Sequence, residues 1–443
     1  MGCRRLSLPL PRQPISPRSR RVLGVGLGLH PPLNPPITAP AAGGAGGLAA
    51  RRLRVGGEGL ERARAGSGVV YRKWVESPGY LPAGALVELV DDAGEPAACG
   101  LWEPTGPVAV RVLHPGACPW SSPGEALESL LEEALRARER LGPLYRGSFR
   151  LVNSDGDGIS GLIVDYYGSV AVVQSSSAAV DAHLGLVARW LHSTLGASVY
   201  EKSTQRSRRD IGLPPRARWL LGRAGRVVVE EAGVRFPVDV VRGQKTGFYL
   251  DQRPNRVEMQ RLTGPGDRVL DVFAYTGGFA LHALHAGATR ALLVEEDPHA
   301  ASLAREAARL NGVEDRLEVA LGSAWETLPR LRPGYTIVAV DPPAFIQDAA
   351  PDAVRRGKRA YWRAYTTALK LAADNAIAYL SSCSYHLTRR DFTRLASRAA
   401  SHAGFRHHRI LGSLRGAGPD HTLRSQEYLD YLKGAYIHLA RKL

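Results

Sequence analysis

An acid and a glycine-rich turn in the C-terminal half of the chain have the spacing of a small-molecule site. Asp271 ends an apolar run, and Thr276, Gly277 and Gly278 follow it in the segment DVFAYTGGFA. Glycines let the backbone approach a ligand closely, and free amides at a helix start can bind a carboxylate. The turn lacks the GxGxxG spacing of dinucleotide-binding folds. It therefore suits a zwitterionic amino-acid cofactor, with Asp271 accepting a hydrogen bond from the ammonium group.

Two further acids follow the next apolar runs. Glu295 can accept both hydroxyls of a ribose, and the alternative is that it caps the helix predicted from Pro298. Asp341 precedes Pro342 in the segment DPPAF, where two prolines fix the backbone and leave carbonyls free to face a planar base. Sites for an amino acid, a ribose and a base together predict S-adenosyl-L-methionine (SAM), the methyl donor of methyltransferases.

Cys383 follows the apolar run Ile377–Leu380, which is the next predicted strand after the one that ends at Asp341. A buried cysteine is more often an inert apolar residue than a nucleophile. Its position beside the predicted cofactor site favours the nucleophile. A thiolate that adds to C6 of a pyrimidine activates C5 for methylation, which is covalent catalysis. We therefore interpret Cys383 as the nucleophile and Asp341 as the group that assists protonation at N3 or holds the exocyclic amine.

Residues 241–443 alternate apolar runs with amphipathic segments, which predicts an α/β fold with a mostly parallel sheet covered on both faces. The predicted strands are Arg268–Val272, Ala291–Glu295, Leu317–Ala320, Ile337–Val340 and Ile377–Leu380. The predicted helices are Gly278–Ala286, Pro298–Leu310, a stretch near 360–373 and Arg389–Ala403. Ligands of such sheets bind outside the carboxyl ends of the strands, where all the candidate residues fall.

The N-terminal half predicts two other modules. Residues 50–118 contain short strands and a turn at Asp92-Ala93-Gly94, which indicates a small β-barrel. Residues 121–240 begin with an amphipathic helix over Glu125–Leu141 and continue with strands and a helix near Val180–Leu195, which indicates an α+β domain. Residues 1–49 are rich in Arg, Pro, Gly and Ala and are interpreted as a disordered or spurious extension; a transit peptide is the alternative.

The net charge of +16 is unevenly distributed. Residues 1–57 hold nine arginines and no acid, so the rest of the chain carries +7. This excess suits a polyanionic partner such as RNA, and the alternative is a solvated basic surface.

The cysteines and the hydropathy narrow the class of protein. The four cysteines lack the spacing of a zinc site or a disulfide scaffold, so we expect no metal and a reducing, cytoplasmic compartment; they are Cys3, Cys99, Cys118 and Cys383. The sequence contains no apolar run of about 20 residues, so we expect no membrane span. The oligomeric state stays open, with a homodimer as one option.

From about residue 50 onward the chain resembles the large-subunit ribosomal RNA methyltransferase I family, cytosine-C5 methyltransferases with an N-terminal PUA domain. The resemblance is carried by these segments: RLVNSDGDGISGLIVDYYG (150–168), GQKTGFYLDQRPNR (243–256), DVFAYTGGFA, DPPAF, SSCSY and YLKG (431–434). It implies a PUA-like RNA-binding domain over 50–118, an α+β middle domain over 121–240, and a Rossmann-like class I methyltransferase domain with a mostly parallel seven-stranded sheet over 241–443.

The resemblance also implies roles for individual residues. Large-subunit rRNA is the implied partner, and Cys383 is the implied nucleophile. The cofactor contacts implied in addition to those above are Phe248, Gln252, Phe273, Tyr275 and Ser323, and the implied substrate contacts are Lys245 and Arg253. Ser323 stands where many family members carry an Asp that contacts the adenine. No second cysteine lies beside DPP, so product release requires a general base.

Three other functions remain open at this stage. The first is an RNA methyltransferase that acts on a purine amine or ring nitrogen without a covalent adduct. The second is an inactive RNA-binding factor of ribosome assembly, against which the intact Asp271, Glu295 and Asp341 argue. The third is a nicotinamide dehydrogenase, which the missing GxGxxG motif disfavours.

Overall fold

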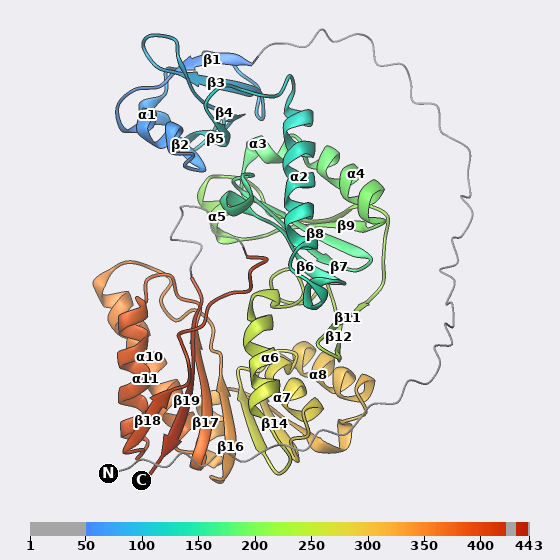
Figure 1. Ribbon diagram of the computed structural model, residues 1–443, viewed down its shortest axis with the longest axis vertical. Coiled ribbons are helices and arrows are strands. Elements are labelled where there is room, and N and C mark those ends of the chain that lie inside the picture. Colours follow the sequence, from blue (N-terminus) through green and yellow to red (C-terminus); the bar gives the residue numbers. More distant parts are fainter. Residues whose placement is uncertain (1–49, 422–430, 442–443) are drawn as a thin grey trace, which may run out of the picture. The chain divides into compact units, whose positions relative to one another are not determined.

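The computed structural model describes residues 50–421 and 431–441. They form three large sheets and a two-stranded hairpin, which follow one another along the chain (Figure 1). The predictions for residues 1–49 lie outside the described residues.

The first sheet has five strands in the order β1-β3-β4-β5-β2. Its elements are β1 (Arg51–Arg54), α1 (Gly57–Arg64), β2 (Val69–Tyr71), β3 (Leu86–Val90), β4 (Pro96–Trp102) and β5 (Val108–Pro115). The predicted turn joins β3 to β4: the side chain of Asp91 accepts from the amides of Ala93 and Glu95, and Gly94 has a φ of +84°. Glycine suits this position because other residues rarely adopt a positive φ.

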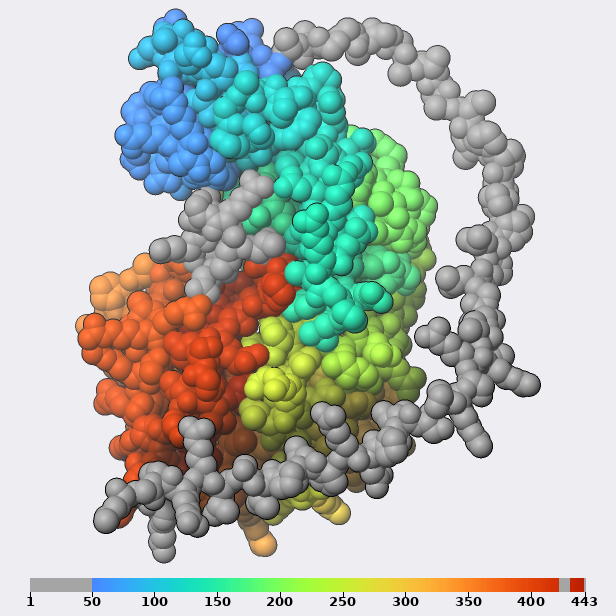
Figure 2. Space-filling model, viewed as in Figure 1, coloured from blue at the N-terminus to red at the C-terminus, as the bar shows by residue number. Residues whose placement is uncertain are grey.

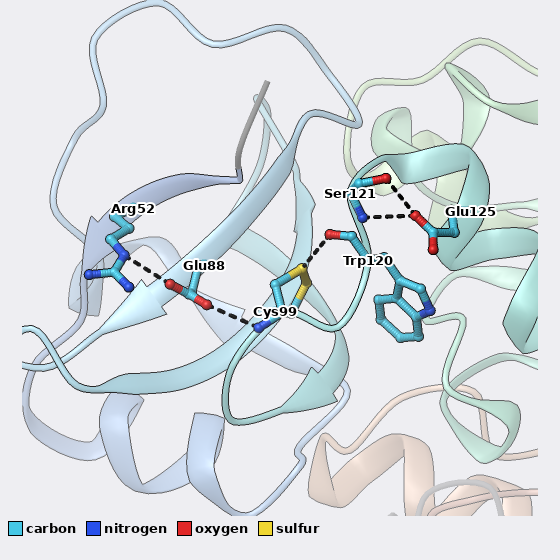
Figure 3. The surroundings of a disulfide bond; sticks show 7 residues. Arg52, Glu88, Cys99, Trp120, Ser121 and Glu125 are labelled. Carbon is cyan, nitrogen blue, oxygen red and sulfur yellow. Dashed lines mark hydrogen bonds and ion pairs between the residues drawn. A yellow bond between two sulfur atoms is a disulfide. The ribbon is translucent and has the colours of Figure 1, made fainter. Parts of the chain in front are cut away.

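Cys99 and Cys118 form a disulfide in this region (Figure 3). The sequence predicts no disulfide, and this prediction is wrong. The pairing of β4 with β5 and the segment that follows β5 bring the two Cα atoms to 4.8 Å, although the residues are 19 positions apart, and no spacing rule reveals such a contact. The Glu88 carboxylate holds the same segment, because it accepts from the Cys118 amide at 3.0 Å and from Arg52 at 2.9 Å.

The second sheet also has five strands, in the order β10-β9-β8-β7-β6. Its elements are α2 (Pro123–Glu139), β6 (Ser148–Asn153), β7 (Leu162–Tyr167), β8 (Val170–Ser175), α3 (Ala178–Asp181), α4 (Leu184–Leu195), β9 (Ser198–Ser203), α5 (Arg206–Asp210) and β10 (Arg216–Leu221). Helix α2 begins where the Ser122 side chain accepts from the Glu125 amide, a standard N-cap. The prediction of this helix is confirmed, whereas the helix predicted near Val180–Leu195 is divided into α3 and α4.

The third sheet has seven strands in the order β15-β14-β13-β16-β17-β19-β18, and the hairpin β11-β12 precedes it. The elements are β11 (Val227–Glu231), β12 (Val234–Val238), α6 (Arg253–Leu262), β13 (Arg268–Val272), α7 (Gly278–His285), β14 (Arg290–Glu295), α8 (Pro298–Leu310), β15 (Leu317–Leu321), α9 (Ala324–Thr327), β16 (Tyr335–Val340), α10 (Pro351–Leu369), β17 (Ala372–Ser382), α11 (Arg389–His402), β18 (His407–Ile410) and β19 (Lys433–Ala440). In this sheet β19 runs opposite to the other six strands, so the predicted fold class is confirmed.

Helices cover both faces of this seven-stranded sheet (Figure 1). Successive side chains of a strand point to opposite faces. Val269 of β13 accordingly packs in a core with α7 and α8, and the adjacent Leu270 packs in a second core with α10 and α11. The carboxyl ends of β13, β14 and β16 therefore meet at one rim.

A buried ion cluster connects the hairpin to two helices of the last domain. Glu231 of β11 accepts from Arg253 at 3.0 Å, from Arg256 at 2.7 Å and from His282 of α7 at 3.0 Å, and all four side chains are buried. Burial alone would raise the pKa of Glu231, but the charge and hydrogen bonds of Arg256 and the contacts of His282 hold it well below its usual range. Glu231 is therefore ionised at neutral pH, whereas burial lowers the pKa of His282.

We expect Glu231→Gln to lower the stability of the protein by about 3–5 kcal/mol, because it leaves two buried guanidinium groups without a counter-charge. Since the folded pKa of Glu231 lies below its unfolded value, the stabilisation is present at neutral pH and is lost as the pH falls through the folded value. Thermal unfolding at pH 7 measures the effect. The exposed neighbour Glu230→Gln is the control, and equal melting temperatures for the two variants would contradict the prediction.

The described residues contain neither a membrane-spanning helix nor a cluster of metal ligands. No described helix is long and apolar enough to cross a membrane. Among the same residues, no group of three or more His, Cys, Asp or Glu side chains is arranged to hold a metal ion.

Candidate active site

A cavity of about 1070 Å³ lies at the carboxyl ends of β13, β14, β16 and β17. Residues from all the predicted motifs line it, and so do residues of the second sheet. Of the predicted site residues, the cavity is lined by Lys245, Phe248, Gln252, Phe273, Tyr275, Thr276, Gly278, Glu295, Asp341, Pro342 and Cys383. The cavity volume exceeds that of many small-ligand sites, so it has room for a cofactor and a nucleotide together.

The turn after β13 has an unusual backbone. Phe273 and Tyr275 have φ values of +62° and +51°, and Gly277 has a φ of +78°. A positive φ costs energy in a residue with a side chain, and such residues cluster at ligand-binding sites. The described chain has six non-glycine residues with a positive φ, and four of them line this cavity. These four are Phe273, Tyr275, Ser154 and Lys245.

Two polar atoms of this turn have no partner within the described chain. One carboxylate oxygen of Asp271 accepts from the Ala280 amide at 3.0 Å, while its Oδ1 and the Oγ1 of Thr276 are buried without a hydrogen bond. Burial raises the pKa of Asp271 well above its usual value, and a bound cation would oppose that shift. Buried polar groups are rarely left unpaired, so these atoms fit a ligand with an ammonium group.

Glu295 is fixed at the end of β14 by backbone amides. Its Oε2 accepts from the Tyr275 amide at 2.7 Å, and its Oε1 accepts from the Asp297 amide at 2.8 Å. Burial raises its pKa despite these bonds. The helix N-cap is Asp297 and not Glu295, which removes the capping alternative that the sequence leaves open.

The motif GQKTGFYLDQR contacts the turn through Tyr275. The Tyr275 hydroxyl accepts from the Gln244 amide at 2.9 Å and donates to the Gly247 carbonyl at 3.0 Å, and its ring packs edge-on against Tyr249. The Lys202 amine of β9 donates to the carbonyls of Val240 and Gly243. The motif is thus held between the turn and the second sheet.

Cys383 and Asp341 lie on the same rim and influence each other. Burial and the charge of Asp341 raise the pKa of the Cys383 thiol to about 12, and the charge of Lys245 opposes this shift. The Asp341 carboxylate accepts from Gln252 Nε2 at 2.8 Å and from the Ser381 hydroxyl. Burial raises the pKa of Asp341 to about 6 although the Ser381 hydrogen bond lowers it. The carboxyl is therefore able to exchange a proton near neutral pH.

Four predicted residues do not line the cavity themselves. Asp271 is buried and accepts from the Ala280 amide, and Gly277 is the N-cap of α7. Ser323 caps α9 by accepting from the Trp325 amide, between the lining residues Gly322 and Ala324. Arg253 is fully buried and its guanidinium pairs with Glu231, because it belongs to the ion cluster.

Asp251 lines the cavity although nothing in the sequence distinguishes it from its neighbours. Its Oδ2 accepts from the Tyr431 hydroxyl at 2.6 Å, while its Oδ1 is buried without a partner in the described chain. The other buried carboxylates of the lining, Asp341 and Glu295, have both oxygens engaged. The signal that marks Asp251 is therefore structural.

Known proteins of similar sequence include a ribosomal RNA large subunit methyltransferase of Deinococcus radiodurans, which is 32% identical over 377 residues. These residues cover 80% of this chain and 89% of the relative. The ribosomal RNA large subunit methyltransferase I of Aeromonas salmonicida is 31% identical over 385 residues, covering 83% of this chain and 94% of the relative. The chain belongs to the family of large-subunit ribosomal RNA methyltransferases.

Models of two domain families match separate parts of this methyltransferase. Residues 203–366 match the S-adenosylmethionine-dependent methyltransferase model, and residues 53–115 match the PUA-like domain model. The fold is shared with a SAM-dependent methyltransferase assigned in Streptococcus mutans, at 19% identity, a TM-score of 0.69, and coverage of 88% of this chain and 100% of that one. A methyltransferase structure complexed with SAH has a TM-score of 0.71 at 20% identity. The cofactor of this methyltransferase is therefore SAM.

The chemistry of the cavity agrees with this cofactor. Asp271 and Thr276 provide unpaired acceptors for an ammonium group, and Glu295 lies at the adjacent strand end, where a ribose is expected. Phe273, Trp325 and Phe345 form an aromatic cluster with ring centroids 5.9–6.2 Å apart, next to the prolines of DPPAF. Phe273 is the member of this cluster that lines the cavity, and its ring, supported by the other two, suits a planar base.

Proposed function

We propose that this methyltransferase forms 5-methylcytosine in large-subunit ribosomal RNA through a covalent bond between Cys383 and C6 of the cytosine. The observation that carries the proposal is the joint presence of a thiol, a carboxyl with a pKa of about 6 and an unpartnered carboxylate in the cofactor cavity. Methylation of a purine nitrogen requires no thiol at this position.

The first step is addition of Cys383 to C6. The thiol is protonated at rest because its pKa is about 12, so the thiolate forms after substrate binds, when the thiol proton passes to the Asp341 carboxylate. Lys245 is the group whose positive charge lowers the pKa of Cys383, and its strained backbone holds it at the cavity. It therefore stabilises the thiolate and contributes positive charge for a phosphate of the substrate.

Asp341 supports the same step from the opposite edge of the ring. Addition at C6 places electron density on C5 and N3, and a proton or hydrogen bond at N3 stabilises it. Asp341 can supply that proton because its pKa is near neutral, and Gln252 and Ser381 fix its orientation. SAM supplies the electrophilic methyl group that C5 then accepts.

Release of the product requires loss of the C5 proton and cleavage of the C6–S bond. We propose that the free Oδ1 of Asp251 takes this proton, which returns the electron pair to the ring and expels the Cys383 thiolate. The Tyr431 hydroxyl orients Asp251 through the other carboxylate oxygen. The chain thus uses separate carboxyl groups for addition and for release.

Three observations support RNA as the substrate. The relatives that cover most of the chain are named for large-subunit ribosomal RNA. The PUA-like domain adds basic and aromatic side chains in contact, with Lys73 Nζ 4.3 Å and Arg62 Cζ 5.5 Å from the ring centroid of Trp74. Residues 58–443 also retain a net charge of +7.

Mass mapping of methylated nucleotides tests this function. Purified enzyme is incubated with isotopically labelled SAM and unmodified large-subunit rRNA transcript, and the RNA is digested to nucleosides. The expected product is 5-methylcytidine at one position. A methylated purine as the sole product, or no methylation of this RNA, would overturn the proposal.

A further inference from the structure

The positive charge of the folded chain is concentrated on two helices. Helices α10 and α11 together contain nine Lys and Arg residues and two Asp residues, so they carry a net +7. Residues 50–443 carry a net +10, so these two helices hold most of that excess. Asp352 and Asp391 are already paired, with Arg355 and Lys358.

Six of these arginines form two rows, with three arginines along each helix. Arg356, Arg359 and Arg363 of α10 are exposed, whereas Gly357, Tyr361 and Tyr365 of the same helix are buried. The same pattern recurs in α11, where Arg390, Arg394 and Arg398 are exposed and Phe392, Ala396 and Ala399 are buried. Residues three and four positions apart lie on one helix face, so each row points away from the sheet.

The two rows lie side by side. The helices pack against each other, both contribute to the same core on one face of the sheet, and the Lys358–Asp391 ion pair joins them. Figure 1 shows these helices, in orange and red, on one side of the last sheet, and Figure 2 is the space-filling view from the same direction. None of the six arginines forms an ion pair within the described chain.

Both rows begin near the active site. Pro343 and Ala344 line the cavity, and α10 starts at Pro351. Cys383 lines it too, and α11 starts six residues later at Arg389. The strand ends that supply the reacting groups therefore lead directly into the two helices, and the rows extend outward from the rim of the cavity.

We infer that this surface, the paired arginine rows of α10 and α11, binds the phosphate backbone of the RNA that flanks the target nucleotide. This inference rests on the proposed function. Arginine presents a planar fork that matches phosphate oxygens, and all six residues are arginine. A solvated helix face would instead alternate acids with bases, whereas these two helices hold only two acids, Asp352 and Asp391, which pair with Arg355 and Lys358. The surface binds independently of sequence, because no contact with base edges is involved.

The test measures binding of a fluorescein-labelled 30-nucleotide RNA hairpin by anisotropy at several salt concentrations. Two variants weaken one row each: Arg356→Gln/Arg359→Gln, which leaves Arg363 on the ring of Trp325, and Arg390→Gln/Arg394→Gln/Arg398→Gln. Each should weaken binding roughly 10–100-fold at 0.1 M salt and reduce the slope of log affinity against log salt by about 2. The KM for RNA rises, while SAM affinity and the rate at saturating RNA stay unchanged.

The control removes three exposed arginines elsewhere, Arg305→Gln/Arg309→Gln/Arg332→Gln, of which the first two lie on α8 against the opposite face of the sheet. If a row variant does not fold, Arg359→Gln and Arg394→Gln are compared with Arg305→Gln. Equal losses of RNA affinity in the row variants and the control variant would overturn the inference. It would also be overturned if the row variants kept their RNA affinity and lost binding to phosphatidylserine vesicles instead. A wild-type enzyme that does not bind or methylate RNA would instead refute the proposed function.

Discussion

Replacing Cys383 with alanine abolishes methyl transfer to RNA, with an expected loss on the order of 10⁴-fold or more in turnover. The reason is that C5 of a pyrimidine does not accept a methyl group until a nucleophile has added at C6. Cofactor binding should persist, because the residues that fit SAM lie at the carboxyl ends of β13, β14 and β16 and not of β17. Turnover with labelled SAM and calorimetric titration of SAM give the two readouts.

Cys383→Ser provides a second comparison at the same position. A hydroxyl is a far weaker nucleophile than a thiol at neutral pH, so this variant should be as inactive as Cys383→Ala although it keeps a polar group. Full activity in either variant would exclude the covalent mechanism. Methylation of a purine amine or ring nitrogen, with Asp341 holding the base, would then be the better account of the cavity.

Replacing Asp251 with asparagine should stall the enzyme after methyl transfer. Because Asn cannot take the C5 proton, the methylated ring stays bonded to Cys383, and a protein–RNA adduct accumulates that wild-type enzyme does not retain. Denaturing gel electrophoresis with labelled RNA detects the adduct, and we expect steady-state turnover to fall by roughly 10²–10⁴-fold.

Tyr431→Phe separates the chemistry of Asp251 from its structural role. This variant removes the hydrogen bond that orients Asp251 but keeps the carboxylate, so turnover should fall less and no adduct should accumulate. If Asp251→Asn forms no adduct and neither transfers the methyl group nor releases product, Asp251 is not the base for the C5 proton. The same conclusion follows if this variant releases product at the normal rate.

The third sheet was predictable because local patterns determine its strands. Arg268–Val272 and Pro298–Leu310 are predicted with the bounds that the structure has, since a buried parallel strand and an amphipathic helix are both visible over a few residues. β19 and β18 were not predicted. Their place in the sheet depends on an antiparallel return after a long connection, which local periodicity does not encode.

The site was predictable in outline and not in detail. Strand order brings Asp341 and Cys383 to one rim, as the alternation of strands and helices predicts. Arg253 is predicted as a substrate contact, but in the structure it is buried against Glu231 of the hairpin, 22 residues earlier in the chain. Local sequence does not reveal this contact. The unpaired oxygen of Asp251 and the pairing of Cys99 with Cys118 likewise depend on three-dimensional contacts between segments.

Incubation with RNA that contains 5-fluorocytidine at the mapped position tests the central claim most directly. Fluorine at C5 cannot leave as a cation, so no base can complete the release, and the intermediate remains bonded to the enzyme. We predict a stable protein–RNA adduct that requires SAM and whose modified peptide, found by mass spectrometry, contains Cys383. Normal methylation without an adduct, or an adduct at another residue, would contradict covalent catalysis by Cys383.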